Sequence, residues 1–166
     1  MSDHDRSDHI RKLARLIEGV DIAMLTTATP EGRLVSRPMG TQEVEFDGDL
    51  WFITRADSGN VAEIGANPQV SVAYANPSRG IYVSVSGIAT IVDDRAKLEQ
   101  LWSPTMRVFF PEGEHDPQLR LIHVDARTAE YWEGPGTAIG KALDIASAAV
   151  TGDRGRAAGN ERVDLP

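Results

Sequence analysis

Two short segments of the sequence carry residue types that could bind a planar ligand with a phosphate group. In the first, Arg37-Pro38-Met39, an arginine stands beside a proline that interrupts a predicted strand. Because proline donates no ladder hydrogen bond, we expect a bulge or a sheet edge there, with N–H and C=O groups free for a polar ligand. The arginine can meet an anionic or electron-rich edge of that ligand. An exposed arginine at a bulge is the simpler interpretation of this tripeptide alone.

The second segment covers residues 54–60, where a predicted strand ends and a helix begins. The start of a helix presents unpaired N–H groups and the positive end of the helix dipole, which suits a phosphate. Thr54 and Ser58 add hydroxyl donors, and Arg55 adds a positive charge. Simple helix capping is the alternative interpretation. Since one hairpin joins the two segments, both could face the same ligand, with one end suited to a ring and the other to a phosphate.

Four aromatic residues in the second half of the chain, Trp102, Phe109, Phe110 and Trp132, could form an aromatic wall. Packing in the core and in a loop is the alternative interpretation of each of them. Phe109 and Phe110 would be costly to leave in water, so the segment that carries them is expected to be a structured loop and not a linker.

The sequence contains no conventional catalytic or metal-binding motif. It has no cysteine, which excludes thiolate metal sites, iron–sulfur clusters and cysteine nucleophiles. Its four histidines are scattered without the HExxH type of spacing, so no metal site is predicted. It also has neither a GxSxG nucleophile elbow nor a GxxxxGK phosphate loop. We therefore assign no catalytic residue from the sequence.

The composition indicates a single acidic globular domain, expected over residues 1–150. The chain has 166 residues, a net charge of −8 and a pI near 4.9. A field of that sign repels phosphate backbones and anionic lipids, which argues against nucleic acid or a membrane surface as the main partner. The apolar runs are far shorter than the roughly 20 residues that a membrane helix needs. The polar N-terminus does not resemble a secretory signal, so a cytoplasmic protein is expected.

Periodicity and turn chemistry predict the elements that must position these residues. A first helix is expected over about residues 7–19, and shorter helices are expected to begin near residues 57–58 and 93–94. Strands are predicted at residues 21–28, 34–44, 50–54, 70–75, 81–92 and 121–132, with a bulge or barrel corner at Gly87. A C-terminal helix is expected over 138–150, and residues 151–166 are expected to be a disordered tail. Closely spaced antiparallel strands with glycine kinks favour a small, mainly β barrel.

Taken in order, these segments resemble the general stress protein 26 group of the pyridoxamine 5′-phosphate oxidase-like, FMN-binding split-barrel superfamily. The resemblance covers about residues 10–135 and depends on the order and spacing of the motifs, since none of them is specific alone. The matching stretches are Arg37-Pro38-Met39, residues 48–54 (GDLWFIT), the Asp57-Ser58 helix start, residues 61–64 (VAEI) with Asn67-Pro68, residues 82–87 (YVSVSG), residues 101–104 (LWSP), residues 109–113 (FFPEG) and residues 129–132 (AEYW).

The resemblance implies a six-stranded antiparallel split β-barrel with flanking helices that forms a homodimer, with FMN in a groove at the dimer interface. It implies a flavin-dependent oxidoreductase or a flavin-binding stress protein whose substrate is unknown. The residues that it places at the flavin are Arg37, Pro38 and Met39 along the isoalloxazine ring, Phe52, Ile53 and Thr54 beside it, Ser58 and Asn60 with Arg55 at the phosphate, and Trp102 and Phe110 as a cover from the same or the partner subunit.

One position departs from the family pattern. Relatives usually carry a lysine in an Asp-Ser-x-Lys pattern where this chain has Asn60. A charge-assisted hydrogen bond is roughly twice as strong as a neutral one, so the asparagine weakens the expected phosphate site unless Arg55 or a close backbone approach at Gly59 compensates. The departure keeps a second hypothesis open, in which the chain is a non-catalytic module that binds a deazaflavin, haem or a pyridoxal compound.

Overall fold

A computed structural model describes residues 3–42, 46–134 and 159–165 of the chain. In this part the elements are α1 (Asp3–Ile17), β1 (Ile22–Ala28), β2 (Leu34–Gly40), β3 (Asp49–Arg55), α2 (Gly59–Ala66), β4 (Gln69–Asn76), β5 (Ile81–Val92), α3 (Arg95–Leu101), a 3₁₀ turn (Pro104–Val108), β6 (Leu119–Glu133) and β7 (Gly159–Asp164). The helices and strands that the sequence predicts within these residues are present. The predicted helix over 138–150 lies outside the described residues.

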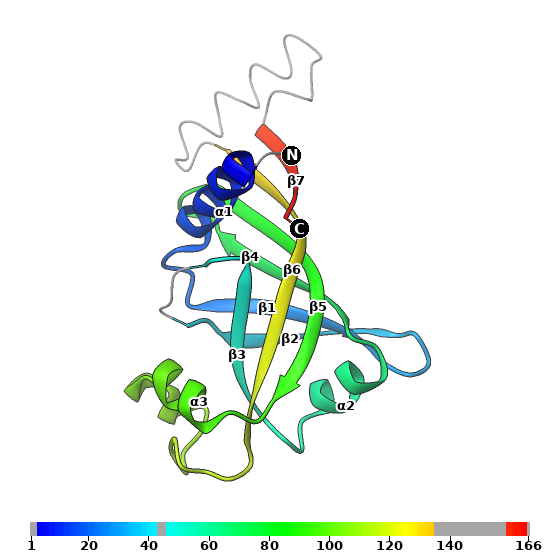
Figure 1. Ribbon diagram of the computed structural model, residues 1–166, viewed down its shortest axis with the longest axis vertical. Coiled ribbons are helices and arrows are strands. Elements are labelled where there is room, and N and C mark those ends of the chain that lie inside the picture. Colours follow the sequence, from blue (N-terminus) through cyan, green and yellow to red (C-terminus); the bar gives the residue numbers. More distant parts are fainter. Residues whose placement is uncertain (1–2, 43–45, 135–158, 166) are drawn as a thin grey trace.

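The strands form one antiparallel sheet that curls into a split barrel (Figure 1). The strand order is β2-β1-β4-β5-β6-β3, so β2 and β3 are the two ends of the curled sheet. These end strands approach each other without any ladder pairing between their described residues. The gap between them is the split of the barrel, and both strands border it with backbone N–H and C=O groups that no neighbouring strand uses.

Local sequence signals explain two details of the sheet. Pro38 lies in β2, an edge strand that pairs only with β1 among the described strands, as its missing N–H predicts. The register of β5 against β6 shifts between Ser86 and Gly87, which confirms the predicted bulge. A Cβ atom at Gly87 would lie only 2.4 Å from the carbonyl oxygen of Asp125, so the close approach of the two strands requires glycine.

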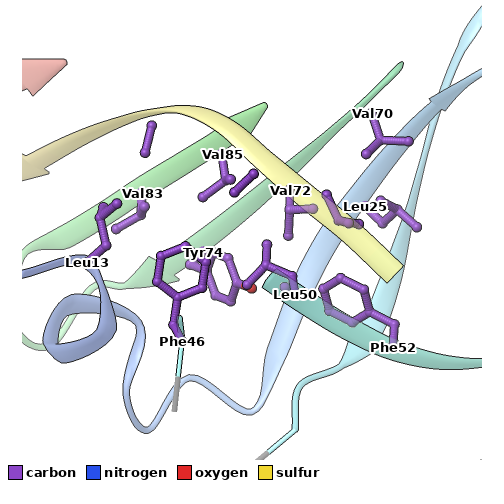
Figure 2. Close-up of a cluster of buried hydrophobic side chains, with 14 of the residues drawn as sticks. Leu13, Leu25, Phe46, Leu50, Phe52, Val70, Val72, Tyr74, Val83 and Val85 are labelled. Atoms are coloured by element: carbon purple, nitrogen blue, oxygen red, sulfur yellow. The ribbon is translucent and has the colours of Figure 1, made fainter. Parts of the chain in front are cut away.

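The main core fills the barrel between the sheet and α1. Figure 2 shows its centre, where Leu50 and Phe52 from β3 meet Tyr74 from β4 and Val85 from β5. A second, smaller cluster lies outside the barrel, where α3 and the 3₁₀ turn pack on β3 and β6; its buried members are Ile53, Leu98, Leu101, Met106, Leu119 and Leu121. Figure 1 shows α1 and β7 toward one end of the long axis and α2 and α3 toward the other.

The expectation of a disordered tail over residues 151–166 is wrong for residues 159–165. Gly159–Asp164 forms β7, which pairs antiparallel with the C-terminal half of β6. That edge of β6 is free beyond β3, because β3 pairs only with residues up to Asp125. The strand also places Val163 and Leu165 in the main core, where they are 3% and 1% exposed. Burial of these two side chains offsets the cost of ordering the segment.

Candidate functional site

The two segments that the sequence analysis singles out meet at the split of the barrel. β2 carries Arg37 and Met39 on its inner face, opposite the buried Leu25 and Ala23 of β1. β3 ends at Arg55 and leads through a short turn into α2, which packs against β1 and β5. The start of α2 therefore lies beside the inner face of β2. This is the place where the expected ligand site should be.

Arg37 is held by an ion pair with a carboxylate of α2. Its Nη1 donates to Oε2 of Glu63 at 2.6 Å and its Nη2 donates to Oε1 at 3.0 Å, so the ion pair is bidentate. The Thr27 hydroxyl joins the pair: it donates to Oε2 of Glu63 at 2.5 Å and accepts from Nη1 of Arg37 at 3.1 Å. Strands β1 and β2 and helix α2 thus each supply one member of a closed polar network.

This network keeps the Glu63 carboxylate ionised. Hydrogen bonds from Arg37 and then from Thr27 lower the pKa of Glu63 from its ordinary 4.5 to about 2, against the opposing effect of burial. The same hydrogen bond to Glu63 raises the pKa of the Arg37 guanidinium. The pair therefore carries one full positive and one full negative charge throughout the neutral range. The Glu63 side chain is 12% exposed and the Arg37 side chain is 31% exposed, so a ligand can reach the arginine more easily than the carboxylate.

The guanidinium of Arg37 lies against the first turn of α2. A Cβ atom added at Gly59 would be 3.0 Å from Nη2 of Arg37, which is tighter than ordinary van der Waals contact. Ser58, the N-cap residue, accepts no capping hydrogen bond through its side chain. The Arg37 guanidinium therefore lies beside a helix start whose N-cap is Ser58 and whose first N–H groups have no partner within the helix.

Asn60 does not present its amide to the Arg37 guanidinium. It is 3% exposed, and its Oδ1 accepts a hydrogen bond from the Thr54 hydroxyl at 3.2 Å. Its Nδ2 lies 3.9 Å from Sδ of Met39, a weak contact with a sulfur acceptor. Thr54 is also buried, at 4%. The structure therefore brings Met39, Thr54 and Asn60 together in an internal polar contact that joins β2, β3 and α2.

Arg55 is not brought together with Arg37. Its Nε donates to Asp57 at 3.1 Å and its Nη1 donates to the buried Asp116 at 2.8 Å. These two carboxylates raise the pKa of the Arg55 guanidinium, with Asp57 as the main cause. Its charge is therefore compensated within the turn that leads into α2.

The predicted apolar and aromatic site residues divide between the two cores. Phe52 is 1% exposed and points into the barrel (Figure 2). Ile53 belongs to the outer cluster, against which Trp102 and Phe110 pack with their ring centroids 6.3 Å apart. Within one subunit these residues fill packing positions. The adjoining Phe109 is 56% exposed, so this loop presents an aromatic ring at the surface.

Glu63 and Thr27 are site residues that the sequence reasoning missed. Each stands in an unremarkable local context, a helix with apolar neighbours and a threonine-rich strand. Their contacts with Arg37 join positions 26 and 10 residues apart in the chain. The β1–β2 pairing brings Thr27 to Arg37, and the packing of α2 on the barrel brings Glu63 to both. A carboxylate on the inward side of a short apolar helix is the one signal that could have suggested a buried partner.

Two hollows border the described residues, and the second of them is lined in part by Thr27 of this network. A cavity of about 670 Å³ opens between α1 and β3, where it is lined by Ile17, Phe46, Phe52 and Tyr74 among others. A shallower groove of about 370 Å³ crosses the outer sheet face and reaches Arg127. Neither contains Arg37 or Glu63. The Arg37–Glu63 pair therefore lies outside both hollows, beside the free edge of the sheet at β2.

The outer face of the sheet carries no charged side chain over four strands. The register and the alternation of burial place there Ile22, Met24, Thr26, Ala28, Leu34, Ser36, Pro38, Gln69, Ser71, Ala73, Ala75, Tyr82, Ser84 and Ser86. Several of the larger apolar ones are well exposed, Leu34 at 72% and Ile22, Met24 and Tyr82 at 40–43%. In a chain with 25% charged residues, a broad uncharged face is typical of a contact surface.

Among the described residues, no group of three or more histidine, aspartate or glutamate side chains is arranged to hold a metal ion. Within the same part of the chain, no helix is long and apolar enough to span a membrane.

Two comparisons by sequence match most of the chain. A family model described as "Pyridoxamine 5′-phosphate oxidase like" matches residues 8–155. Protein bli-3 of Neurospora crassa is 29% identical over 153 residues, which cover 86% of this chain and 73% of the relative.

Solved structures with the same fold include proteins of the general stress group. A general stress protein 26 of Jannaschia sp. CCS1 superposes with a TM-score of 0.72 and is 24% identical in sequence. The match covers 95% of this chain and 99% of that protein. The general stress FMN/FAD binding protein of Xanthomonas citri superposes with a TM-score of 0.65 at 26% identity over 76% of this chain and 89% of its own.

Proposed function

Because the chain belongs to the pyridoxamine 5′-phosphate oxidase-like family, we propose that it binds FMN along the split between β2 and β3. The observation that carries the proposal is the meeting of Arg37 with the start of α2 at that split. The relative from Xanthomonas citri, itself an FMN/FAD binding protein, supports the choice of a flavin.

The residues at the split fit the two ends of a flavin. The phosphate end suits the helix start, where the first N–H groups of α2 and the N-cap residue Ser58 lie beside the Arg37 guanidinium. The ring end suits the edges of β2 and β3, whose free backbone groups can pair with the polar edge of an isoalloxazine. Met39 supplies an apolar contact beside them. In this assignment Thr54 and Asn60 hold the helix start in place instead of touching the phosphate.

A second copy of the chain completes the groove in this proposal. β2 carries Arg37 on its inner face and Pro38 on the uncharged outer face. A partner packed on the outer face would therefore reach the free edge of β2, along which we place the flavin. Two copies with a net charge of −8 each repel one another, and a face without charged side chains keeps that repulsion low where they meet. The exposed loop with Phe109 and Phe110 would reach across from one protomer to cover the ring of its partner.

A bound flavin would supply hydride or electron transfer, and the chain would supply position and electrostatics. Arg37 would orient the flavin, the α2 start would anchor its phosphate, and the partner subunit would exclude water from one side of the ring. The Glu63 carboxylate is engaged by Arg37 and Thr27, so we assign it no role as a general acid or base. We propose on these grounds that the protein is a flavin-dependent oxidoreductase.

The internal position of Asn60 favours a second candidate. With no lysine at the helix start and Arg37 paired to Glu63, the site has less net positive charge than a dianionic phosphate prefers. A non-catalytic module that binds a planar ligand such as a deazaflavin, haem or a pyridoxal compound fits a site with this lower positive charge. A ligand panel read by thermal shift separates the candidates, because a ligand that binds only the folded state raises the unfolding temperature.

The placement of FMN is tested by titrating the protein with FMN and following flavin fluorescence. Arg37→Ala should weaken FMN binding at least tenfold, because it removes the guanidinium that lies against the helix start and leaves the Glu63 carboxylate uncompensated beside the phosphate. Arg79→Ala removes the same charge from an exposed turn between β4 and β5 and should leave the affinity unchanged. Equal affinities for the wild type and Arg37→Ala would show that the flavin, if bound, lies elsewhere.

A further inference from the structure

The Arg37–Glu63–Thr27 network leaves the arginine only partly available to a ligand. A guanidinium has five N–H donors. Three of them are used inside the network, two from Nη1 and one from Nη2. The Nε–H and the second Nη2 hydrogen are the donors that remain, and Nη2 is the atom that lies against Gly59 at the start of α2. The network thus fixes both which donors face the helix start and where they point.

The network also offsets the charge of the arginine. Glu63 approaches both terminal nitrogens of Arg37 within hydrogen-bond distance, and the paired carboxylate stays ionised. The nearby cations do not restore the balance: Arg55 is engaged by Asp57 and Asp116, and the position expected to hold a lysine is the neutral Asn60. Arg33 adds only a weak long-range effect on Glu63, the last of the causes acting on its pKa.

We propose that Glu63 is the positioning residue that sets how strongly this site distinguishes a phosphorylated flavin from an unphosphorylated one. It holds the guanidinium of Arg37 at the start of α2 and offsets its charge. The phosphate of FMN therefore adds little affinity, and the protein binds riboflavin nearly as well as FMN. This inference rests on the proposed flavin site and goes beyond it by naming the residue that determines phosphate selectivity.

The test compares the dissociation constants of FMN and riboflavin for the wild type and for Glu63→Gln. Glutamine keeps an oxygen that can accept from Arg37 but removes the negative charge beside the phosphate. The preference for FMN over riboflavin should rise about fivefold, the effect of roughly 1 kcal/mol from one partly exposed charge. Glu99→Gln, an exposed position on α3, makes the same change in net charge and should leave the preference unchanged.

A purely structural role for Glu63 would have a different signature. The variant would then bind both flavins more weakly by the same factor, and an unchanged preference would overturn the proposal. Glu63→Asp keeps the charge, so its preference should stay at the wild-type value even where its affinity for both flavins falls. A higher preference in Glu63→Asp would also contradict the proposal.

The wild-type protein provides a measurement that does not depend on the folding of any variant. An uncompensated charged donor contributes about tenfold to a hundredfold to phosphate affinity. The wild-type preference for FMN should therefore lie below about tenfold, and a preference above about a hundredfold would overturn the role of Glu63 while leaving the flavin site in place. Failure of the wild type to bind either flavin would instead overturn the proposed function, and this inference with it.

Discussion

Glu63 links the stability of the protein to pH through its contacts with Arg37 and Thr27. The pKa of this carboxyl is lowered to about 2 in the folded protein, whereas it is near 4.5 in an unfolded chain. A group whose folded pKa is depressed stabilises the fold above the unfolded pKa and loses that contribution as the pH falls toward the folded value. The network should therefore stabilise the protein fully above about pH 5.5 and progressively less between about pH 4.5 and pH 2.

Glu63→Gln should accordingly be less stable than the wild type at pH 7, with a difference that shrinks in acid. The glutamine cannot ionise, so only the wild type loses the contribution as protons bind. Urea unfolding of both proteins at pH 7, 5 and 3.5 measures the difference, and Glu99→Gln provides the control for net charge. A stability difference that stayed constant from pH 7 to pH 3.5 would contradict an ionised Glu63 in the folded protein.

Gly59 is the residue that lets Arg37 reach the start of α2. In Gly59→Ala the new methyl group would press on Nη2 of Arg37, so we expect FMN affinity to fall severalfold. Gly65→Ala in the same helix meets no atom within 4 Å and should leave the affinity unchanged. Both variants gain up to about 1 kcal/mol of helix propensity, so an effect of helix stability would appear in both. Equal FMN affinities for the two would show that the Arg37 contact does not matter.

At the scale of single elements, β7 makes the clearest prediction because it lies where a disordered tail was expected. Leu165 is 1% exposed in the main core, and its N–H donates to the carbonyl of Arg127 at 2.8 Å. Leu165→Ala should lower the free energy of unfolding by about 2 kcal/mol or more, as buried leucines do. The adjacent exposed Asp164→Ala should change it by less than about 0.5 kcal/mol. Equal stability of the two variants in urea unfolding would mean that the segment does not pack.

The elements that local patterns determine were predictable. β5 covers Ile81–Val92 as its alternation predicts, Gly87 forms the bulge, and Asp94 caps α3 by accepting from the N–H of Lys97. Strand β7 could not be predicted, because residues 159–165 are mostly polar and form a strand only by pairing with the free edge of β6. Pairing of distant segments is decided by tertiary structure, which local propensity does not contain.

The candidate site, too, could be predicted only in part from the sequence. The sequence predicts that the Arg37 segment and the start of α2 face one another, because a hairpin joins their strands and each suits one end of a ligand. It does not predict that Asn60 turns inward to Thr54 or that Glu63 pairs with Arg37. Both contacts depend on how α2 settles on the barrel, so residue type alone could not distinguish a ligand contact from an internal one.

At the scale of the whole molecule, the uncharged outer sheet face predicts self-association. Ala73 lies in the middle of this face on β4, between Met24 of β1 and Ser84 of β5. Ala73→Glu would place a charge in the proposed interface and should shift the protein from dimer to monomer, with a loss of FMN affinity. Burying an unpaired charge is strongly unfavourable, so the dimer dissociation constant should rise at least a hundredfold.

Ala96→Glu introduces the same charge on the exposed side of α3 and should leave the dimer intact. Sedimentation equilibrium measures both variants. A dimeric Ala73→Glu protein would show that the copies associate through another surface, and a monomeric wild type would contradict the dimer itself.

The most direct test of the central claim is gel filtration of the wild-type protein after incubation with excess FMN, with protein and flavin absorption recorded together. A groove formed at the split by two copies predicts that flavin absorption elutes with the protein at the size of a dimer. Elution of the protein without flavin would contradict the proposed function. Elution of flavin with a monomer would contradict the part of the account in which a second copy completes the site.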